Sequence, residues 1–253
     1  HQESYEGYCS DIFTDQALGF IEQNKEGPFF CYLAFNAPHT PLQVPDSYYQ
    51  MYKDADPAKG FEGDDRPFPE MNDKDKEDAR RVYAMVTNID DNVGKVLQKV
   101  KDMGIVENTV VIFMTDNGPQ QRRYIAGLRG RKGSVYRGGV RVPFFLQYPG
   151  KWKGDTDINT TAAHIDMLPT IASICDAPLP KGVKIDGRDL VPVISGQKVD
   201  WENRSMFFYW TRRYPELYNN IAMQKGPYKL VGNTSYDAKI TDFQLFNIKA
   251  DPY

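Results

Sequence analysis

The stretch VENTVVIFMTDNGPQ (106–120) sets the fold class of this chain. Residues 110–115 form an apolar run of strand length, which is typical of a strand buried on both faces of a sheet. Asp116, Asn117 and Gly118 then end the run with polar and turn-forming residues. Polar residues at the end of such a strand are where open α/β sheets place their ligands. The stretch therefore predicts a sheet with helices around it and a site at its edge.

Similar runs and helical patterns continue on both sides of this stretch. Two more strands are predicted at FFCYLAF (29–35) and PFFLQYPG (143–150). Helices are predicted over 11–24, with Thr14 as the N-cap, and over 78–104 and 164–176. This alternation favours an α/β fold, with a mostly parallel sheet covered by helices.

From about residue 200 the pattern changes to short, partly alternating segments separated by turn-rich links. The segments SMFFYW, NNIAMQKG, PYKLV and FQLFNI predict a small antiparallel sheet of about four strands. We therefore expect one part of an α/β domain over residues 1–198 and a smaller antiparallel subdomain over 199–253. The aromatic stretch FFYWTRRYPELY (207–218) offers rings on which sugars could stack, or it forms the core of that subdomain.

Composition excludes several classes of protein. A net charge of -3 argues against a general nucleic-acid binder, whose surface would be basic. The three cysteines have no CxxC spacing, so neither a redox motif nor a zinc site is indicated. No apolar run approaches 18 residues, and we expect no membrane span.

The loop GLRGRKGSVYRGGVRVP (127–143) carries four arginines, one lysine and five glycines but no acid. Glycines let the backbone approach a ligand closely, and the cations suit an oxyanion. Lys132 is followed by Gly133 and not by Ser or Thr, so the spacing of a nucleotide-binding P-loop is missing. The alternative is a solvated surface loop whose glycines only turn the chain.

Polar residues follow the first two predicted strands. His39 comes after the first strand, and Asp116 with Asn117 comes after the second. A carboxylate and an amide are hard oxygen donors suited to calcium or magnesium, although calcium needs six to eight oxygens and the others must come from elsewhere. Taken singly, an Asp-Asn-Gly sequence is also an ordinary turn, and a lone histidine is often structural.

Together, four segments resemble a known family. FFCYLAFNAPHTPLQVP, VVIFMTDNGPQ, GLRGRKGSVYRGGVRVPFFLQYPG and HIDMLPTIASICDAP, in this order, resemble the carboxyl-terminal half of type I sulfatases of the arylsulfatase kind, within the alkaline-phosphatase-like superfamily. The resemblance covers nearly the whole chain. It implies that the complete enzyme hydrolyses a sulfate ester, with sulfated glycans as a candidate substrate class.

The resemblance also implies roles for individual residues. His39 would contact the sulfate and help to protonate the leaving oxygen, and Lys132 would neutralise the sulfate. Asp116 and Asn117 would be two of the ligands of one calcium ion. His164 is a candidate for a substrate-facing role, the alternative being a structural residue at a helix start.

The nucleophile that the resemblance implies is missing. In this family it is a formylglycine made from the first residue of a C/S-x-P/A-x-R motif, and no cysteine or serine of this chain fits that motif. We therefore expect a fragment of a longer sulfatase that is inactive by itself. The family implies a periplasmic, secreted or lysosomal-type compartment, and the sequence leaves the oligomeric state open.

Two other functions stay open. One is a phosphoryl or phosphonate ester hydrolase of the same superfamily. The other is a catalytically silent module that binds sulfated glycans through the basic loop.

Overall fold

A computed structural model describes residues 4–61, 69–201, 203–212, 214, 218–233 and 238–251. The chain divides into two compact units. The first consists of His1–Val111, Gln120–Gly127 and Tyr148–Gly150. The second consists of Ile112–Pro119, Leu128–Gln147 and Lys151–Tyr253. The expected division after residue 198 stays a prediction.

The first unit is helical. Its elements are α1 (Cys9–Asn24), α2 (Asp46–Tyr49), α3 (Asp73–Asp102) and the short 3₁₀ helix η1 (Val106–Asn108). Helix α3 confirms the predicted long helix but begins earlier, because Asn72 and Asp75 each accept the other's backbone N–H in a capping box. The helix ends before Gly104, whose φ is +68°.

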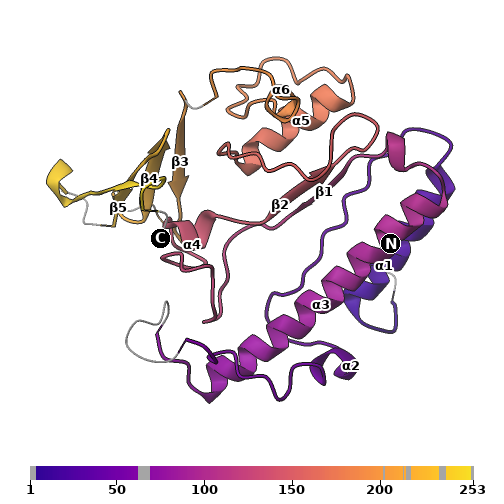
Figure 1. Cartoon of the computed structure of the whole chain (residues 1–253), viewed down its shortest axis with the longest axis horizontal. Coiled ribbons are helices and arrows are strands. Elements are labelled where there is room, and N and C mark those ends of the chain that lie inside the picture. The colour runs from indigo at the N-terminus through magenta and orange to yellow at the C-terminus, as the bar shows by residue number, and fades with distance from the viewer. Residues whose placement is uncertain are drawn as a thin grey trace. The chain divides into compact units, whose positions relative to one another are not determined.

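Helices α1 and α3 lie alongside each other (Figure 1). Buried amides stabilise the contact: the side chains of Asn88 and Asn92 donate to one carboxylate oxygen of Asp11, at 2.9 and 2.7 Å. Thr14, expected as the N-cap of α1, lies inside the helix, and its hydroxyl donates to the carbonyl of Ser10. The helix begins earlier than expected, so the N-cap prediction was wrong.

The predicted strand FFCYLAF is also wrong. Residues 29–35 belong to no strand, and Phe30 and Tyr32 are 68% and 83% exposed. An apolar run becomes a strand only when another strand satisfies its backbone N–H and C=O groups. Among the described residues, no strand pairs with this segment.

Strands β1 (Val111–Met114) and β2 (Phe144–Gln147) confirm the other two predicted strands and pair in a two-stranded sheet. The rings of Phe113 and Phe145 meet across the pair, with centroids 6.3 Å apart. The connection between them includes α4 (Arg137–Val140), and η2 (His164–Asp166), α5 (Met167–Ile174) and α6 (Val191–Ile194) follow. The α/β class is confirmed, with a smaller sheet than expected.

The predicted antiparallel sheet is confirmed. Strands β3 (Ser205–Tyr209), β4 (Ile221–Lys225), β5 (Tyr228–Gly232) and β6 (Gln244–Asn247) pair in chain order, and η3 (Ile240–Asp242) precedes β6. One face of the sheet forms a small core whose members come from the sheet and from the basic loop. These residues are Val135, Ala222 and Val231, with Tyr136, Phe208 and Phe246 packed against them.

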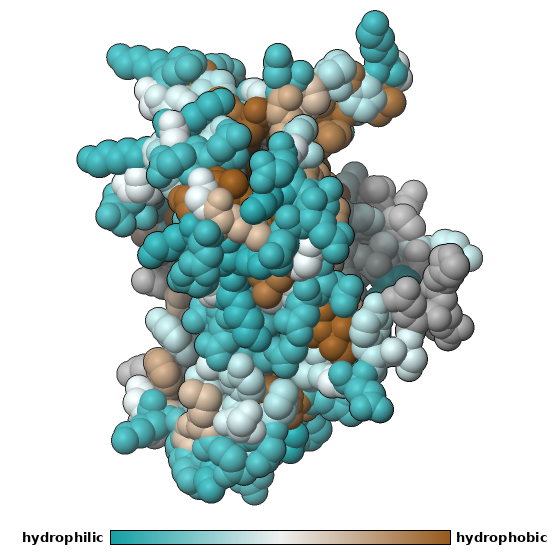
Figure 2. All heavy atoms as spheres, turned by 90° about the vertical axis from the view of Figure 1, so that its right-hand side faces the viewer, coloured by the Kyte–Doolittle hydropathy of each residue, from teal (hydrophilic) through white to brown (hydrophobic). Residues whose placement is uncertain are grey.

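The outer surface is mixed in character. On the face drawn in Figure 2, hydrophilic side chains predominate, and apolar residues lie between them in small groups. Among the described residues, no helix is both long enough and apolar enough to cross a membrane.

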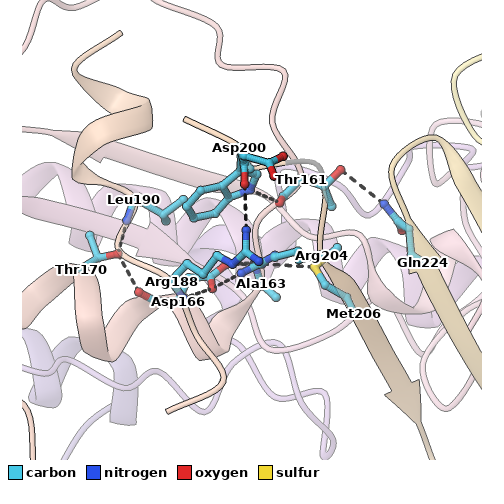
Figure 3. A network of polar contacts seen from close by, with 11 residues as sticks. Thr161, Ala163, Asp166, Thr170, Arg188, Leu190, Asp200, Arg204, Met206 and Gln224 are labelled. Carbon is cyan, nitrogen blue, oxygen red and sulfur yellow. Dashed lines mark hydrogen bonds and ion pairs between the residues drawn. The ribbon is translucent and has the colours of Figure 1, made fainter. Parts of the chain in front are cut away.

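A buried ion pair joins η2 to the antiparallel sheet (Figure 3). The guanidinium of Arg204 donates two hydrogen bonds of 2.7 Å to the carboxylate of Asp166, whose side chain is fully buried. The same carboxylate accepts the backbone N–H groups of Ala163 and Arg188, each at 2.8 Å. Pairing and hydrogen bonding of this kind offset the free-energy cost of burying the two charges.

We predict that Asp166→Ala lowers the free energy of unfolding by about 3–5 kcal/mol, because it leaves the Arg204 charge buried and unpaired. The matched control is Asp186→Ala, which breaks an exposed ion pair with Lys184 and should cost less than about 1 kcal/mol. Urea unfolding of both variants measures the difference. Equal effects would show that the buried pair does not hold η2 to the sheet.

Lys229 on β5 is a second buried charge, and it is unpaired. Its side chain is 2% exposed, and its ammonium has no hydrogen-bond partner among the described residues. The ammonium lies 4.6 Å from the centre of the Phe208 ring, a cation–π contact. Burial, and to a lesser extent the charge of Arg137, lowers the pKa of Lys229 from 10.5 to about 8.

The lowered pKa of Lys229 makes the free energy of unfolding depend on pH. Between pH 8 and 10.5 the unfolded chain binds a proton that the folded chain has lost, so stability rises with pH across this window. Below pH 8 both states are charged, and the folded state carries the full cost of the buried ammonium. We predict that Lys229→Met raises the free energy of unfolding at pH 7 by about 1–3 kcal/mol, and by less at about pH 9.5.

Denaturant unfolding at the two pH values measures this gain. The control is Lys225→Met, because Lys225 is exposed on β4 and its loss should change stability by less than about 0.5 kcal/mol. A gain that does not depend on pH would contradict the assignment to the ammonium.

Candidate active site

The turn after β1 carries the two predicted metal ligands. The backbone N–H of Asn117 donates to Oδ1 of the exposed Asp116 at 2.8 Å, and its Nδ2 donates to the carbonyl of Gly118 at 2.9 Å. Among the described residues, Oδ2 of Asp116 and Oδ1 of Asn117 accept no hydrogen bond. These two hard oxygens fit part of a calcium shell, which needs six to eight.

No fuller metal site is present in the described part of the chain. There, no group of three or more His, Cys, Asp and Glu side chains could hold a metal ion. Calcium bound by Asp116 and Asn117 would need further oxygen ligands, such as main-chain carbonyls, water or other side chains.

Glycines set the basic loop against this turn. The N–H of Gly118 donates to the carbonyl of Gly139 at 2.8 Å, and a Cβ on Gly118 would lie 1.8 Å from the carbonyl oxygen of Gly138. A Cβ on Gly138 would in turn lie 2.2 Å from the carbonyl oxygen of Gly130. No side chain fits at such distances, so only glycine allows these backbones to touch.

Lys132 lies beside the same turn. Its backbone N–H donates to the carbonyl of Pro119 at 2.9 Å, and its side chain is half-buried. Two glycines with positive φ, Gly130 and Gly133, let the loop turn on both sides of it. The structure therefore brings Lys132, Asp116 and Asn117 together within the second unit.

Two other cations of the loop, Arg129 and Arg137, have structural contacts. The guanidinium of Arg129 stacks on the ring of Tyr136 at 4.1 Å, and that of Arg137 donates to the carbonyl of Ile248 at 3.3 Å. Arg131 is exposed to solvent. Lys132 is thus distinguished from its neighbours by its place next to the turn.

His164 reaches the end of β1 from η2. Its Nε2 lies 2.7 Å from the carbonyl oxygen of Thr115, the residue before Asp116. A carbonyl only accepts, so Nε2 carries the hydrogen and Nδ1 is the remaining ring nitrogen. The Asp166 ion pair fixes η2, and with it the place of this imidazole. A substrate-facing role for His164 stays a prediction.

His39 belongs to the first unit. Its backbone N–H donates to the carbonyl of Asn36 at 3.0 Å, in a turn that contains the cis bonds Ala37-Pro38 and Thr40-Pro41. Its Nδ1 lies 2.8 Å from the carbonyl oxygen of Thr40 and must therefore be the protonated nitrogen. This leaves Nε2 of the exposed imidazole without a bond to the described residues, and the substrate role of His39 stays a prediction.

The three cysteines of the chain are free thiols. Cys9, Cys31 and Cys175 are exposed and form no disulfide. Partial burial raises the pKa of the Cys31 thiol, which disfavours the reactive thiolate.

Asn220 is a residue that the sequence reasoning missed. Its Nδ2 donates to the carbonyl of Gly133 at 2.8 Å, and its Oδ1 accepts the N–H of Val135 at 3.2 Å. It thereby ties the Lys132 loop to the start of β4. The only signal in the sequence was an Asn-Asn pair before a predicted strand. Asparagine tolerates the φ of +52° that Asn220 adopts, but the pair does not reveal the long-range contact.

Comparison with known proteins gives two family matches. The family model described as Sulfatase matches residues 1–177, and the model described as N-sulphoglucosamine sulphohydrolase, C-terminal, matches residues 131–253. The chain is similar to the uncharacterized sulfatase YdeN of Escherichia coli (29% identity, 91% of this chain, 39% of the relative). It is also similar to arylsulfatase A of Homo sapiens (30% identity, 89% of this chain, 38% of the relative).

Among solved structures, the crystal structure of Ps i-CgsB in complex with k-i-k-neocarrahexaose is 26% identical, with a TM-score of 0.78. The alignment covers 99% of this chain and 51% of that protein. The chain therefore spans between about two fifths and half of the length of these relatives. Because the family model covers well over half of the chain, the protein belongs to the sulfatase family.

Proposed function

We propose that the whole protein containing this chain hydrolyses a sulfate ester, and that this chain supplies the cationic and metal-binding side of its active site. The observation that carries the proposal is the close packing of the Lys132 loop on the Asp-Asn-Gly turn through Gly118, Gly138 and Gly139. It holds the backbone of Lys132 beside the turn that carries two free hard oxygens, and a cation together with such oxygens suits an anionic ester group.

In this proposal Lys132 and His39 act on the ester directly. The ammonium of Lys132 binds the sulfate oxygens and offsets the charge that develops as the ester bond breaks. His39 acts in its doubly protonated form: Nδ1–H donates to the carbonyl of Thr40, and Nε2 gives its proton to the leaving oxygen. His164, held beside Thr115, faces the substrate next to the metal ligands.

We propose calcium as the cofactor of the whole protein. Oδ2 of Asp116 and Oδ1 of Asn117 would hold it, because carboxylate and amide oxygens are its preferred ligands. When bound, the ion would polarise a sulfate oxygen as a Lewis acid. The remaining ligands would be further oxygens, such as main-chain carbonyls, water or other side chains.

The nucleophile of this proposal is a formylglycine that lies outside these 253 residues. The support is that no cysteine or serine of the chain is in the required motif. The chain by itself is then inactive, since positioning groups cannot replace the attacking group.

Sulfated carbohydrate is the substrate class that we propose. The support is that the similar protein Ps i-CgsB has been crystallised with neocarrahexaose, together with an aromatic pocket beside the Lys132 loop. From the family, we also propose that the whole protein is periplasmic, secreted or located in a lysosomal-type compartment.

We predict that Lys132→Ala in the whole protein lowers kcat for an aryl sulfate by about 100- to 1,000-fold, because it removes the fixed cation at the developing charge. The control is Arg131→Ala, which removes the same charge from the neighbouring exposed position and should leave kcat within about twofold. Steady-state kinetics of both variants make the comparison.

Equal losses of kcat in Lys132→Ala and Arg131→Ala would mean that the loop acts only through its overall charge. Faster hydrolysis of a phosphonate monoester than of the sulfate ester would favour the phosphonate hydrolase alternative. Binding of a sulfated glycan without turnover of either ester would favour the silent binding module.

We predict that calcium raises the Tm of the whole protein, and that Asp116→Asn removes most of this rise, because it replaces a charged ligand with a neutral one. The control is Asp90→Asn, an exposed acid on α3, which should keep the calcium response. An unchanged response in Asp116→Asn would exclude this carboxylate from the metal site.

A further inference from the structure

A cavity of about 330 Å³ lies within the second unit, directly beside the Lys132 loop. Gly133 and Ser134, the two residues after Lys132, form one side of it. The ends of the antiparallel strands form the rest. The residues that matter for the argument are Trp210, Arg212, Asn219 and Asn233.

Trp210 is the aromatic surface of this cavity. Its indole is 42% exposed although it follows the end of β3, and three atoms of its six-membered ring lie 3.4–3.6 Å from the position of a Cβ on Gly133. The glycine therefore lets the indole approach the backbone next to Lys132. An exposed tryptophan held at a cavity wall is a surface on which a sugar ring can stack.

Polar groups surround the indole. The guanidinium of Arg212 lies 5.8 Å from the centre of the Trp210 ring, within cation–π range. The hydroxyl of Ser134 and the amide of Asn233 also line the cavity, and both can bond to sugar hydroxyls. Among the described residues that line the cavity, Arg212 is a cation and none is an acid, which favours an anionic ligand over a neutral one.

Asn220 connects the cavity to the candidate active site. It lines the cavity and at the same time bonds to Gly133 and Val135 of the Lys132 loop. Its Nδ2 also lies 3.1 Å from the carbonyl of Trp210. One side chain thus fixes the stacking surface relative to the loop that carries the proposed sulfate-binding lysine.

We propose that this cavity is a binding subsite for an acidic sugar ring that is linked to the sulfated ring. The neighbouring ring stacks on Trp210, and its carboxylate or second sulfate pairs with Arg212. The inference rests on the proposed function, since it takes Lys132 as the sulfate contact. It adds that an oligosaccharide with a second anionic group is preferred over a single sulfated sugar.

Isothermal titration of the 253-residue chain tests the proposal without requiring turnover. The probe is a chondroitin 6-sulfate disaccharide, in which a uronic acid is joined to 6-sulfated N-acetylgalactosamine. It is compared with N-acetylgalactosamine 6-sulfate, with the disaccharide whose carboxylate is reduced to an alcohol, and with the unsulfated disaccharide. Expression in a host without N-glycosylation keeps Asn233, which begins an Asn-Thr-Ser sequence, unmodified.

We expect the disaccharide to bind about tenfold more tightly than the monosaccharide, as a stacked ring and one ion pair would give. Trp210→Ala should remove this gain, and Arg212→Gln should reduce it to the level of the carboxyl-reduced probe. The matched controls are Trp152→Ala, an indole outside the cavity, and Arg131→Gln, an exposed cation of the loop. Thermal melts confirm that each variant is folded.

The outcomes separate this inference from the proposed function. Equal affinities for the disaccharide and the monosaccharide overturn the subsite and leave the sulfate contact standing. Binding of the unsulfated disaccharide that depends on Trp210, with no binding of the sulfated monosaccharide, overturns the sulfate contact and keeps the subsite. Failure of all four probes to bind overturns the subsite as well. The subsite is also overturned if Trp152→Ala loses as much affinity for the disaccharide as Trp210→Ala does.

Discussion

The contact of one glycine backbone with another, at Gly118 and Gly138, is the constraint on which the candidate site depends. It brings the end of β1 and the basic loop so close that a single methyl group would overlap a carbonyl oxygen. The bond from Lys132 to Pro119 then fixes the lysine backbone beside the Asp-Asn-Gly turn. The site is therefore built from main-chain geometry first, and the charged side chains are placed by it.

Two polar arrangements from the rest of the second unit support this geometry. The Asp166 and Arg204 pair holds η2 in place, and η2 carries the imidazole of His164 to the carbonyl of Thr115. Asn220 does the same for the loop, by bonding to the backbone on both sides of Ser134. The antiparallel sheet thus supports the candidate site residues and also forms the wall of the proposed sugar subsite.

Sequence reasoning worked where local signals were sufficient. The apolar run before Asp116 and the repeating pattern of α3 predict their elements correctly, because burial and helical period are properties of short segments. It failed at residues 29–35, where the run is as apolar as a strand but pairing depends on a partner that the segment itself does not encode. The prediction of Thr14 as an N-cap was wrong for a related reason. The helix begins at Cys9, so Thr14 lies inside it.

The sequence by itself determined the α/β class, the antiparallel sheet and the residue types that suit a sulfate ester. It placed His39, Asp116, Asn117, Lys132 and His164 in segments that resemble a family, and their roles stay predictions. Only the tertiary structure decided which nitrogens of His39 and His164 are free, which glycines touch, and that Asn220 and Trp210 lie beside the Lys132 loop. These facts depend on contacts between residues up to about ninety positions apart, and no local pattern records such contacts.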